Sequence, residues 1–66
     1  MTKIAKEVDG IITREARKLV VKGGSFEEVR QKAVRKVYAK YPRLDVGTLF
    51  GGFDHRYTEA LVQRAA

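Results

Sequence analysis

The side chains best suited to chemistry gather near the end of the chain, directly after Gly51 and Gly52. Four polar residues follow these glycines at helical spacing, and they are His55, Arg56, Glu59 and Gln63. In the major groove of DNA, Arg pairs with guanine, Gln pairs with adenine and Glu accepts from cytosine. The same types are also ordinary on the solvent-facing side of a helix. The spacing therefore leaves two interpretations open, a base-reading surface and a plain helix surface.

The composition excludes several kinds of chemistry. The chain has 66 residues, no cysteine and one histidine, so a disulfide framework, a thiolate nucleophile and a cysteine or histidine-rich zinc site are all excluded. His55 follows Asp54, a predicted helix start, where the positive end of the helix dipole disfavours the imidazolium form. No nucleophile with an orienting carboxylate accompanies it. We expect no enzyme, and therefore no catalytic residue, metal or cofactor.

Net charge is the strongest bulk feature. The chain has 14 Lys and Arg residues against 8 Asp and Glu residues, which gives a net charge of +6. A small basic domain is biased toward polyanions because phosphate binding releases counterions. The basic residues concentrate before residue 45, whereas residues 45–66 carry more acidic than basic side chains. The expected phosphate-contacting residues are Lys6, Arg14, Arg17, Lys18, Lys32, Arg35 and Lys36. A solvated helix surface is the alternative interpretation of this charge.

The first basic residues belong to a predicted helix over residues 3–22. Apolar residues recur there at steps of three and four, which places them on one side of a helix. Thr2 is a candidate N-cap, and Gly23-Gly24 supplies the ending that helices favour. Asp9-Gly10 is a turn signal inside this segment, so a kink or a division into two shorter helices is an alternative.

A second helix is predicted over residues 26–40. Ser25 followed by Glu28 forms a capping box, in which the serine oxygen accepts from an amide of the first turn. Pro42 ends this helix because it lacks an amide hydrogen and its ring clashes with the preceding turn. Tyr38 falls on the polar side of this helix, beside Arg35, and is the best exposed aromatic candidate for stacking on a base.

Arg30 lies near the apolar side of the second helix. We expect its aliphatic stem to cover apolar surface while its guanidinium reaches water or Glu27. A buried Arg30 would need a carboxylate partner, for which Asp45 and Glu59 are the candidates.

The last part of the chain predicts two short helices with glycines between them. Asp45 caps a helix over residues 46–50, Gly51-Gly52 ends it, and Asp54 caps a last helix over residues 55–64. The fold class is therefore all-α. We expect one domain, residues 1–66, built as a small three- or four-helix bundle with a helix-turn-helix-like C-terminal hairpin.

Residues 26–64 resemble the helix-turn-helix (tri-helical) DNA-binding domain. In one register the positions of that family fall on Thr48, Gly52, Phe53, Thr58 and Leu61. A second register, with Gly51 as the turn glycine, also fits in part. The resemblance implies that the last helix reads bases while the basic helices hold phosphates.

Two kinds of function follow from these features. The first is a small basic DNA-binding protein, either a transcriptional regulator or an accessory factor in DNA transactions, with duplex DNA as partner and RNA as an alternative. The second is a protein-binding module of phage or plasmid type that docks on a larger host or nucleic-acid-processing protein. Its interface candidates are Phe50, Phe53, Tyr57 and Leu61.

Size and hydropathy set the remaining expectations. A chain this short buries little apolar surface, so we expect a homodimer or another stabilising partner. No apolar stretch approaches the roughly 20 residues needed to span a bilayer, and the first residues lack the apolar region of a secretory signal. We therefore expect no membrane partner and a cytoplasmic location, with the nucleoid if DNA is the ligand.

Overall fold

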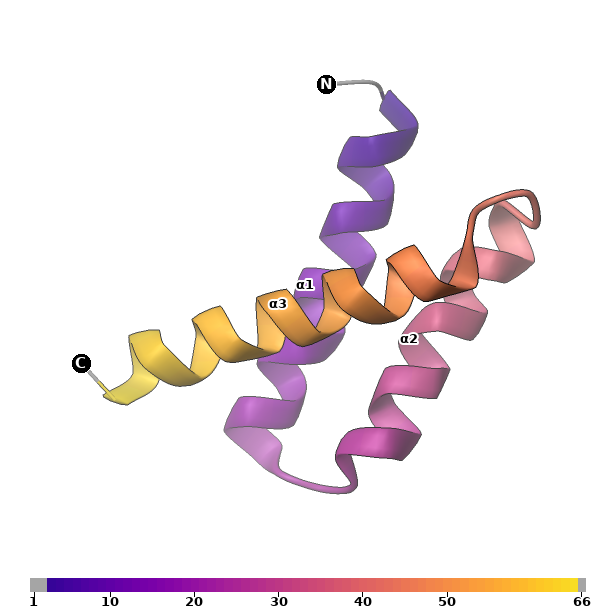
Figure 1. The fold of residues 1–66 in the computed structure, drawn as a ribbon. Coiled ribbons are helices and arrows are strands. Elements are labelled where there is room, and N and C mark those ends of the chain that lie inside the picture. The colour runs from indigo at the N-terminus through magenta and orange to yellow at the C-terminus, as the bar shows by residue number, and fades with distance from the viewer. Residues whose placement is uncertain (1–2, 66) are drawn as a thin grey trace.

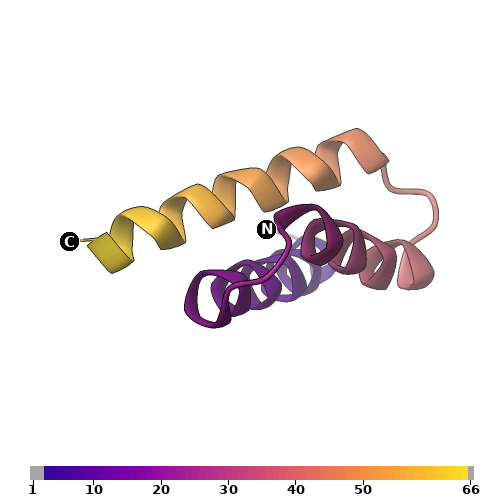
Figure 2. The same cartoon turned by 90° about the horizontal axis from the view of Figure 1, so that it is seen from below.

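Three helices make up the described part of the chain. The computed structural model describes residues 3–65, which form α1 (Lys3–Lys22), α2 (Phe26–Lys40) and α3 (Val46–Ala65). α1 and α2 run antiparallel side by side, and α3 crosses one face of this pair (Figures 1 and 2). The Cα positions extend over 35 × 25 × 16 Å, so the molecule is two helix layers thick. This confirms the predicted all-α bundle.

α1 is one continuous helix. It passes through Asp9-Gly10 without a break, so the alternative of two shorter helices is wrong. Its end is the predicted one, because Gly23 and Gly24 take φ angles of +79° and +117°, which glycine adopts most readily. The Gly23 amide donates to the Leu19 carbonyl at 2.8 Å and closes the last turn. Thr2, the candidate N-cap, lies outside the described residues.

α2 begins and ends where the sequence predicts. The Ser25 hydroxyl accepts a hydrogen bond from the Glu28 amide at 3.3 Å, which confirms the serine side of the capping box. At the other end the Tyr41 amide donates to the Val37 carbonyl at 2.8 Å, directly before Pro42. The second helix therefore has the length that its capping residues set.

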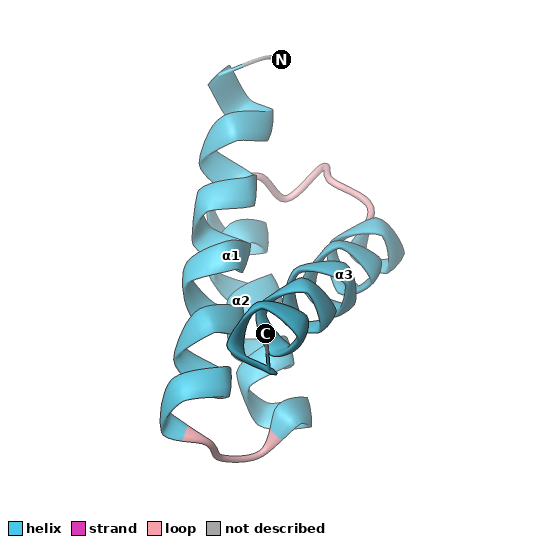
Figure 3. Ribbon diagram, turned by 90° about the vertical axis from the view of Figure 1, so that its left-hand side faces the viewer, coloured by secondary structure: helices cyan, strands magenta, loops and turns pink. Residues whose placement is uncertain are grey.

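α3 corrects the most specific prediction about the fold. It is one helix from Val46 to Ala65, and Figure 3 shows it unbroken, so the predicted glycine turn and the separate helices over 46–50 and 55–64 are wrong. Asp45 does cap the helix, since its Oδ2 accepts from the Thr48 amide at 3.0 Å. Asp54, expected to be a second cap, lies in the helix interior.

Packing explains why α3 continues through its glycines. Leu49 and Phe53 lie one turn apart, on either side of Gly51-Gly52, and both are buried against the other helices. Burial of two large side chains outweighs the cost of about 1 kcal/mol that each mid-helix glycine imposes relative to alanine. A Cβ on Gly52 would lie 3.9 Å from Ile12, so this glycine also marks a close approach of α3 to α1.

All three helices contribute to the core. Its small residues, Ala16 and Ala33, are fully buried and permit close packing of α1 and α2. Within residues 3–65 the buried apolar residues are Ile12, Ala16, Leu19, Ala33, Val34, Val37, Leu49 and Phe53. Phe53 is one of the two largest fully buried side chains, and its ring centroid lies 5.6 Å from that of Phe26. The core therefore fastens α3 across the α1–α2 pair.

Arg30 has a partner that the sequence did not indicate. Its Nε lies 3.2 Å from Asp54 Oδ1, and its guanidinium lies over the Phe50 ring, 4.4 Å from the centroid. The Arg30 side chain is 27% exposed, so it lies on apolar surface and still reaches water as expected, whereas the Glu27 contact and the candidates Asp45 and Glu59 are wrong. The sequence pattern assigned Asp54 to a helix cap, and a capping side chain turns back to its own helix and not toward α2. This ion pair was therefore not predicted.

Candidate nucleic-acid interface

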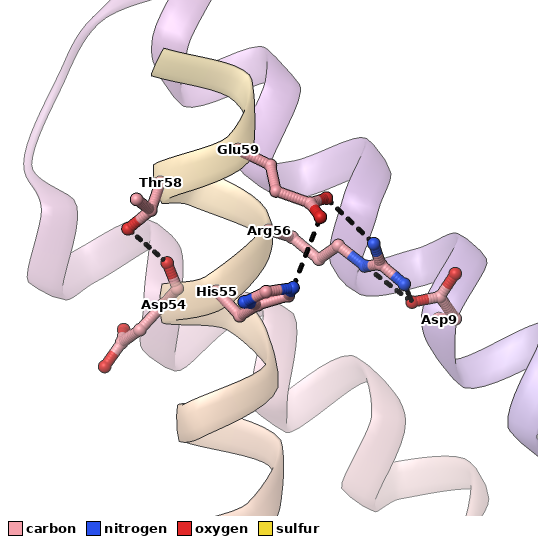
Figure 4. A network of polar contacts seen from close by, with 6 residues as sticks. All are labelled: Asp9, Asp54, His55, Arg56, Thr58 and Glu59. Atoms are coloured by element: carbon pink, nitrogen blue, oxygen red, sulfur yellow. Dashed lines mark hydrogen bonds and ion pairs between the residues drawn. The ribbon is translucent and has the colours of Figure 1, made fainter. Parts of the chain in front are cut away.

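The residues predicted to read bases lie where α3 crosses α1, and three of them are linked to one another and to α1. Arg56 Nε and Nη2 each lie 2.8 Å from Asp9 Oδ1, and Arg56 Nη1 donates to Glu59 Oε1 at 2.8 Å (Figure 4). His55 Nε2 lies 3.2 Å from Glu59 Oε2. The network joins the middle of α3 to the first half of α1. Each of the three guanidinium nitrogens of Arg56 contacts a carboxylate of the protein.

The charges in this network reinforce one another. Hydrogen bonds to Glu59 and Asp9 raise the pKa of Arg56, and the hydrogen bond from Arg56 lowers the pKa of Glu59. Both groups therefore stay ionised near neutral pH. A DNA base would have to compete with two carboxylates for Arg56, which makes this arginine a poor free reader of guanine in the geometry observed.

The side of α3 that faces away from the other helices has little charge. Every third or fourth residue along it is exposed, and these residues are Thr48, Gly51, His55, Thr58 and Val62. Neither Lys nor Arg occurs among them. Of the predicted reading residues, only His55 points to this side, while Gln63 lines a small hollow with Arg17, Arg56 and Glu59. α3 therefore lacks the cations with which a recognition helix approaches phosphates.

Free positive charge lies instead on α1 and α2. We define the basic face as Arg14, Lys18, Lys22, Lys32, Arg35 and Lys36, all of them exposed. Glu15 joins its two halves, because this buried carboxylate on α1 lies 2.6 Å from Lys36 Nζ on α2 and 4.0 Å from Lys18 Nζ. The two helices lie side by side under α3 (Figure 2), so their basic residues form one surface.

Glu15 is an anion beneath a group of cations. Its side chain is 5% exposed, and the hydrogen bond from Lys36 lowers its pKa, aided by the charges of Lys18 and Lys32 and opposed by burial. The carboxylate therefore stays ionised and holds Lys36 in place. Since one carboxylate serves several lysines, most of the positive charge above it remains available to an external anion.

The predicted phosphate-contacting residues divide into two groups. Arg14, Lys18, Lys32, Arg35 and Lys36 lie together on the basic face. Lys6 and Arg17 are also exposed on α1, and Arg17 borders both sides, because it lines a hollow with Arg14, Lys18 and Lys22 and another with Glu59 and Gln63. Lys22 belongs to the basic face, although it was not among the residues predicted to contact phosphates. Its position, four residues after Lys18, was the signal that would have found it.

The end of the α1–α2 pair where α1 begins and α2 ends has its own charged contacts. Lys40 makes an ion pair with Glu7, and the Tyr41 hydroxyl donates to the same carboxylate at 2.5 Å. These contacts raise the pKa of Lys40 and lower that of Glu7. Lys40, like Lys36, therefore has a fixed carboxylate partner, but its partner is Glu7 near the start of α1, and we define the basic face around Glu15 without it.

The predicted protein-interface residues are mostly packed inside the molecule. Phe53 is fully buried, so its selection as an interface anchor is wrong, because the same ring that looked available holds α3 on the core. Phe50 and Tyr57 are half-buried and pack against the core cluster. Leu61 remains 43% exposed and is the one member of that group that a partner could reach freely.

Comparisons with known proteins found no relative of this chain. Protein-family models, curated proteins and solved structures give no match to this chain. Within residues 3–65, no group of three or more His, Cys, Asp and Glu residues is placed to hold a metal ion. No helix in that range has the length and hydropathy to cross a membrane.

Proposed function

We propose that this protein binds duplex DNA through the basic face of α1 and α2, chiefly by contacts to phosphates. The observation that supports the proposal is the row of exposed cations on two adjacent helices. Among the described residues, Arg14, Lys32 and Arg35 have no carboxylate within ion-pair distance. Such side chains can exchange water and counterions for phosphates without breaking an internal contact.

This mode of binding favours an accessory role in DNA transactions over a sequence-reading regulator. Phosphate contacts set position and orientation but carry no sequence information. Base reading by α3 would require Arg56 to leave Asp9, and the outward side of α3 presents no cation to the backbone. Binding to chromosomal DNA would place the protein in the cytoplasm, with the nucleoid.

The first experiment measures fluorescence anisotropy of a labelled duplex over a range of salt concentrations. Each neutralised phosphate contributes about −0.9 to the slope of log affinity against log salt, so four or five contacts give a slope of roughly −4. Affinity should then fall about 250-fold between roughly 50 and 200 mM salt. Absence of binding at about 50 mM salt would reject the proposal.

Paired variants locate the contact surface. Lys32→Ala combined with Arg35→Ala removes two cations of the basic face and should reduce the steepness of the salt slope by about 2. Arg43→Ala combined with Arg64→Ala removes the same charge from the loop after α2 and the end of α3, and it should change the slope much less. Equal effects of the two double variants would show that bulk charge, not the basic face, drives binding. Competition between the duplex and a structured RNA separates the two nucleic acids.

Exposed apolar residues on α3 support protein binding as the second candidate function. Leu61 and Val62 are 43% and 64% exposed, side by side near the end of the helix. A partner protein would bury them, whereas DNA binding through the basic face leaves them in water. Retention of a partner on the immobilised protein after nuclease treatment, and its loss with Leu61→Ala, would favour this candidate. A homodimer remains a prediction that sedimentation can test.

A further inference from the structure

Beside the basic face lies an apolar groove that phosphate binding alone does not use. It is formed between α2 and the first turns of α3, with a volume of about 530 Å³, within the range of roughly 300–1,000 Å³ common for small-molecule sites. Val34, Val46 and Phe50 supply its apolar lining. Gln31, Arg35 and Tyr38 contribute the polar atoms.

Tyr38 is the tyrosine of this chain without an internal role. The Tyr41 hydroxyl donates to Glu7, and the Tyr57 ring lies 5.0 Å from the Phe26 centroid and stacks on Phe53. Tyr38 is 43% exposed, and within residues 3–65 it makes neither a hydrogen bond nor an aromatic contact. An exposed ring at the edge of an apolar groove is a surface on which a flat ring can stack.

The groove is continuous with the basic face. Arg35 lines the groove and also borders the outer surface of α2 that carries Lys32 and Lys36. A strand held by its phosphates on the basic face would therefore pass the opening of the groove. The chemistry at this point combines an aromatic ring for stacking, an amide with both donor and acceptor atoms, and a guanidinium for a phosphate.

We propose that this groove accepts an unpaired nucleobase next to the duplex held by the basic face. Tyr38 stacks on the base, the Gln31 amide meets its edge, and Arg35 contacts the adjoining phosphate. The inference rests on the proposed function and adds a preference to it. The preferred DNA is a duplex that continues into unpaired nucleotides, because bases inside a duplex are already stacked on their neighbours and cannot enter.

Three DNA probes test the preference by fluorescence anisotropy. The first is a blunt duplex, the second carries a short single-stranded overhang of thymines, and the third carries an overhang of the same length made of abasic sites. The third probe has the same added phosphates but no added bases. Stacking of one base should make the thymine probe bind about tenfold more tightly than the abasic probe. Equal affinities for these two probes overturn the inference and leave the proposed function standing.

Variants assign the effect to the groove. Tyr38→Ala should remove the tenfold preference and leave affinity for the blunt duplex unchanged, whereas Tyr38→Phe should retain most of the preference because the ring remains. Val62→Ala, at an exposed apolar residue of α3, should change nothing. A preference that survives Tyr38→Ala overturns the inference, as does an equal loss on all three probes. Absence of binding to every probe rejects both the inference and the proposed function.

Discussion

The two faces of the α1–α2 pair differ in how their charges are used. On the face that α3 covers, Arg56 is held by Asp9 at 2.8 Å and Arg30 by Asp54 at 3.2 Å. On the basic face, Arg35 and its neighbours extend from the helices, and Glu15 is the one buried carboxylate beneath them. Cations of the first face hold helices together, whereas on the second face Glu15 pairs with Lys36 and Lys18, and the remaining cations have no ion pair within residues 3–65. Net charge alone does not distinguish the two kinds.

This difference changes which arginine matters for binding. By type and spacing, Arg56 is the more attractive candidate, since it follows the glycines and can pair with guanine. By contacts, Arg35 is the better one, because no Asp or Glu within residues 3–65 makes an ion pair with it. A phosphate that recruits Arg56 must replace charge-assisted hydrogen bonds, and the gain from its own contact is reduced by that loss.

The largest expected effect comes from separating α3 from the other two helices. Phe53→Ala removes a fully buried ring and should lower the free energy of unfolding by about 3–5 kcal/mol. A domain of this size has little more than that in total, so the variant should be largely unfolded at room temperature. Thermal unfolding followed by circular dichroism measures the change. Leu61→Ala, at a half-exposed position of the same helix, is the control and should have a small effect. A stable Phe53→Ala variant would mean that α3 is not fastened by this ring.

The next effect concerns the carboxylate under the basic face. Glu15→Gln keeps the size of the side chain but removes the charge that holds Lys36, and it should cost about 1–2 kcal/mol of stability at neutral pH. The same variant should bind duplex DNA more tightly, since it removes an anion from the binding surface. Opposite signs for stability and affinity are the expected result. A parallel loss of both would show that Glu15 organises the face and does not oppose phosphates.

The pH dependence of Glu15 has a defined sign. Its pKa in the folded protein is lowered from the ordinary value of 4.5. The ionised form is therefore favoured by folding, and the stabilisation is present above about pH 4.5 and is lost as the pH falls through the lowered folded value. The wild-type protein should lose stability over this acid range, and Glu15→Gln should lose less. Urea unfolding at several pH values below 5 measures the difference.

The sequence predicted local features of the fold well. Both caps with strong side-chain signals, Ser25 and Asp45, accept the expected amide hydrogen bonds, and Gly23 has the positive φ that its position suggested. These features depend on a few neighbouring residues, so a linear reading can find them. The exposed basic residues of α1 and α2 were found for the same reason, since helical periodicity separates them from the apolar side.

Long-range packing could not be predicted in the same way. Gly51-Gly52 is a turn signal by local propensity, and only the burial of Leu49 and Phe53 against the other helices keeps the chain helical there. The partner choices of Arg30 and Arg56 depend on how α3 crosses α1 and α2, which no local pattern specifies. The residues predicted to read bases do lie on one helix, but the contact of Arg56 with Asp9 was not predicted.

A glycine substitution tests this account of α3. Gly51 is a solvent-exposed residue in the middle of α3, and a Cβ at this position would meet no atom within 4 Å. Gly51→Ala should therefore stabilise the protein by about 0.5–1 kcal/mol. A turn glycine with positive φ would give the opposite sign. Gly23, at φ +79°, provides the control, and Gly23→Ala should destabilise by about 1 kcal/mol. The two thermal midpoints should therefore move in opposite directions. Destabilisation by Gly51→Ala would contradict a continuous α3 and favour a glycine turn between two short helices.

The smallest expected effect on DNA binding is also the most direct test of the comparison between the two faces. Arg56→Ala removes a cation that Asp9 and Glu59 already hold, so affinity for a duplex should fall by less than about twofold. The thermal midpoint should fall as well, because the link from α3 to α1 is lost. Asp9→Asn complements it by weakening the hold on Arg56 without removing the guanidinium. If internal pairing is what keeps Arg56 from DNA, Asp9→Asn should raise affinity, and combining it with Arg56→Ala should cancel the gain. A loss of affinity with Arg56→Ala that is larger for one duplex sequence than for others would show the reverse, that Arg56 leaves Asp9 to read a base.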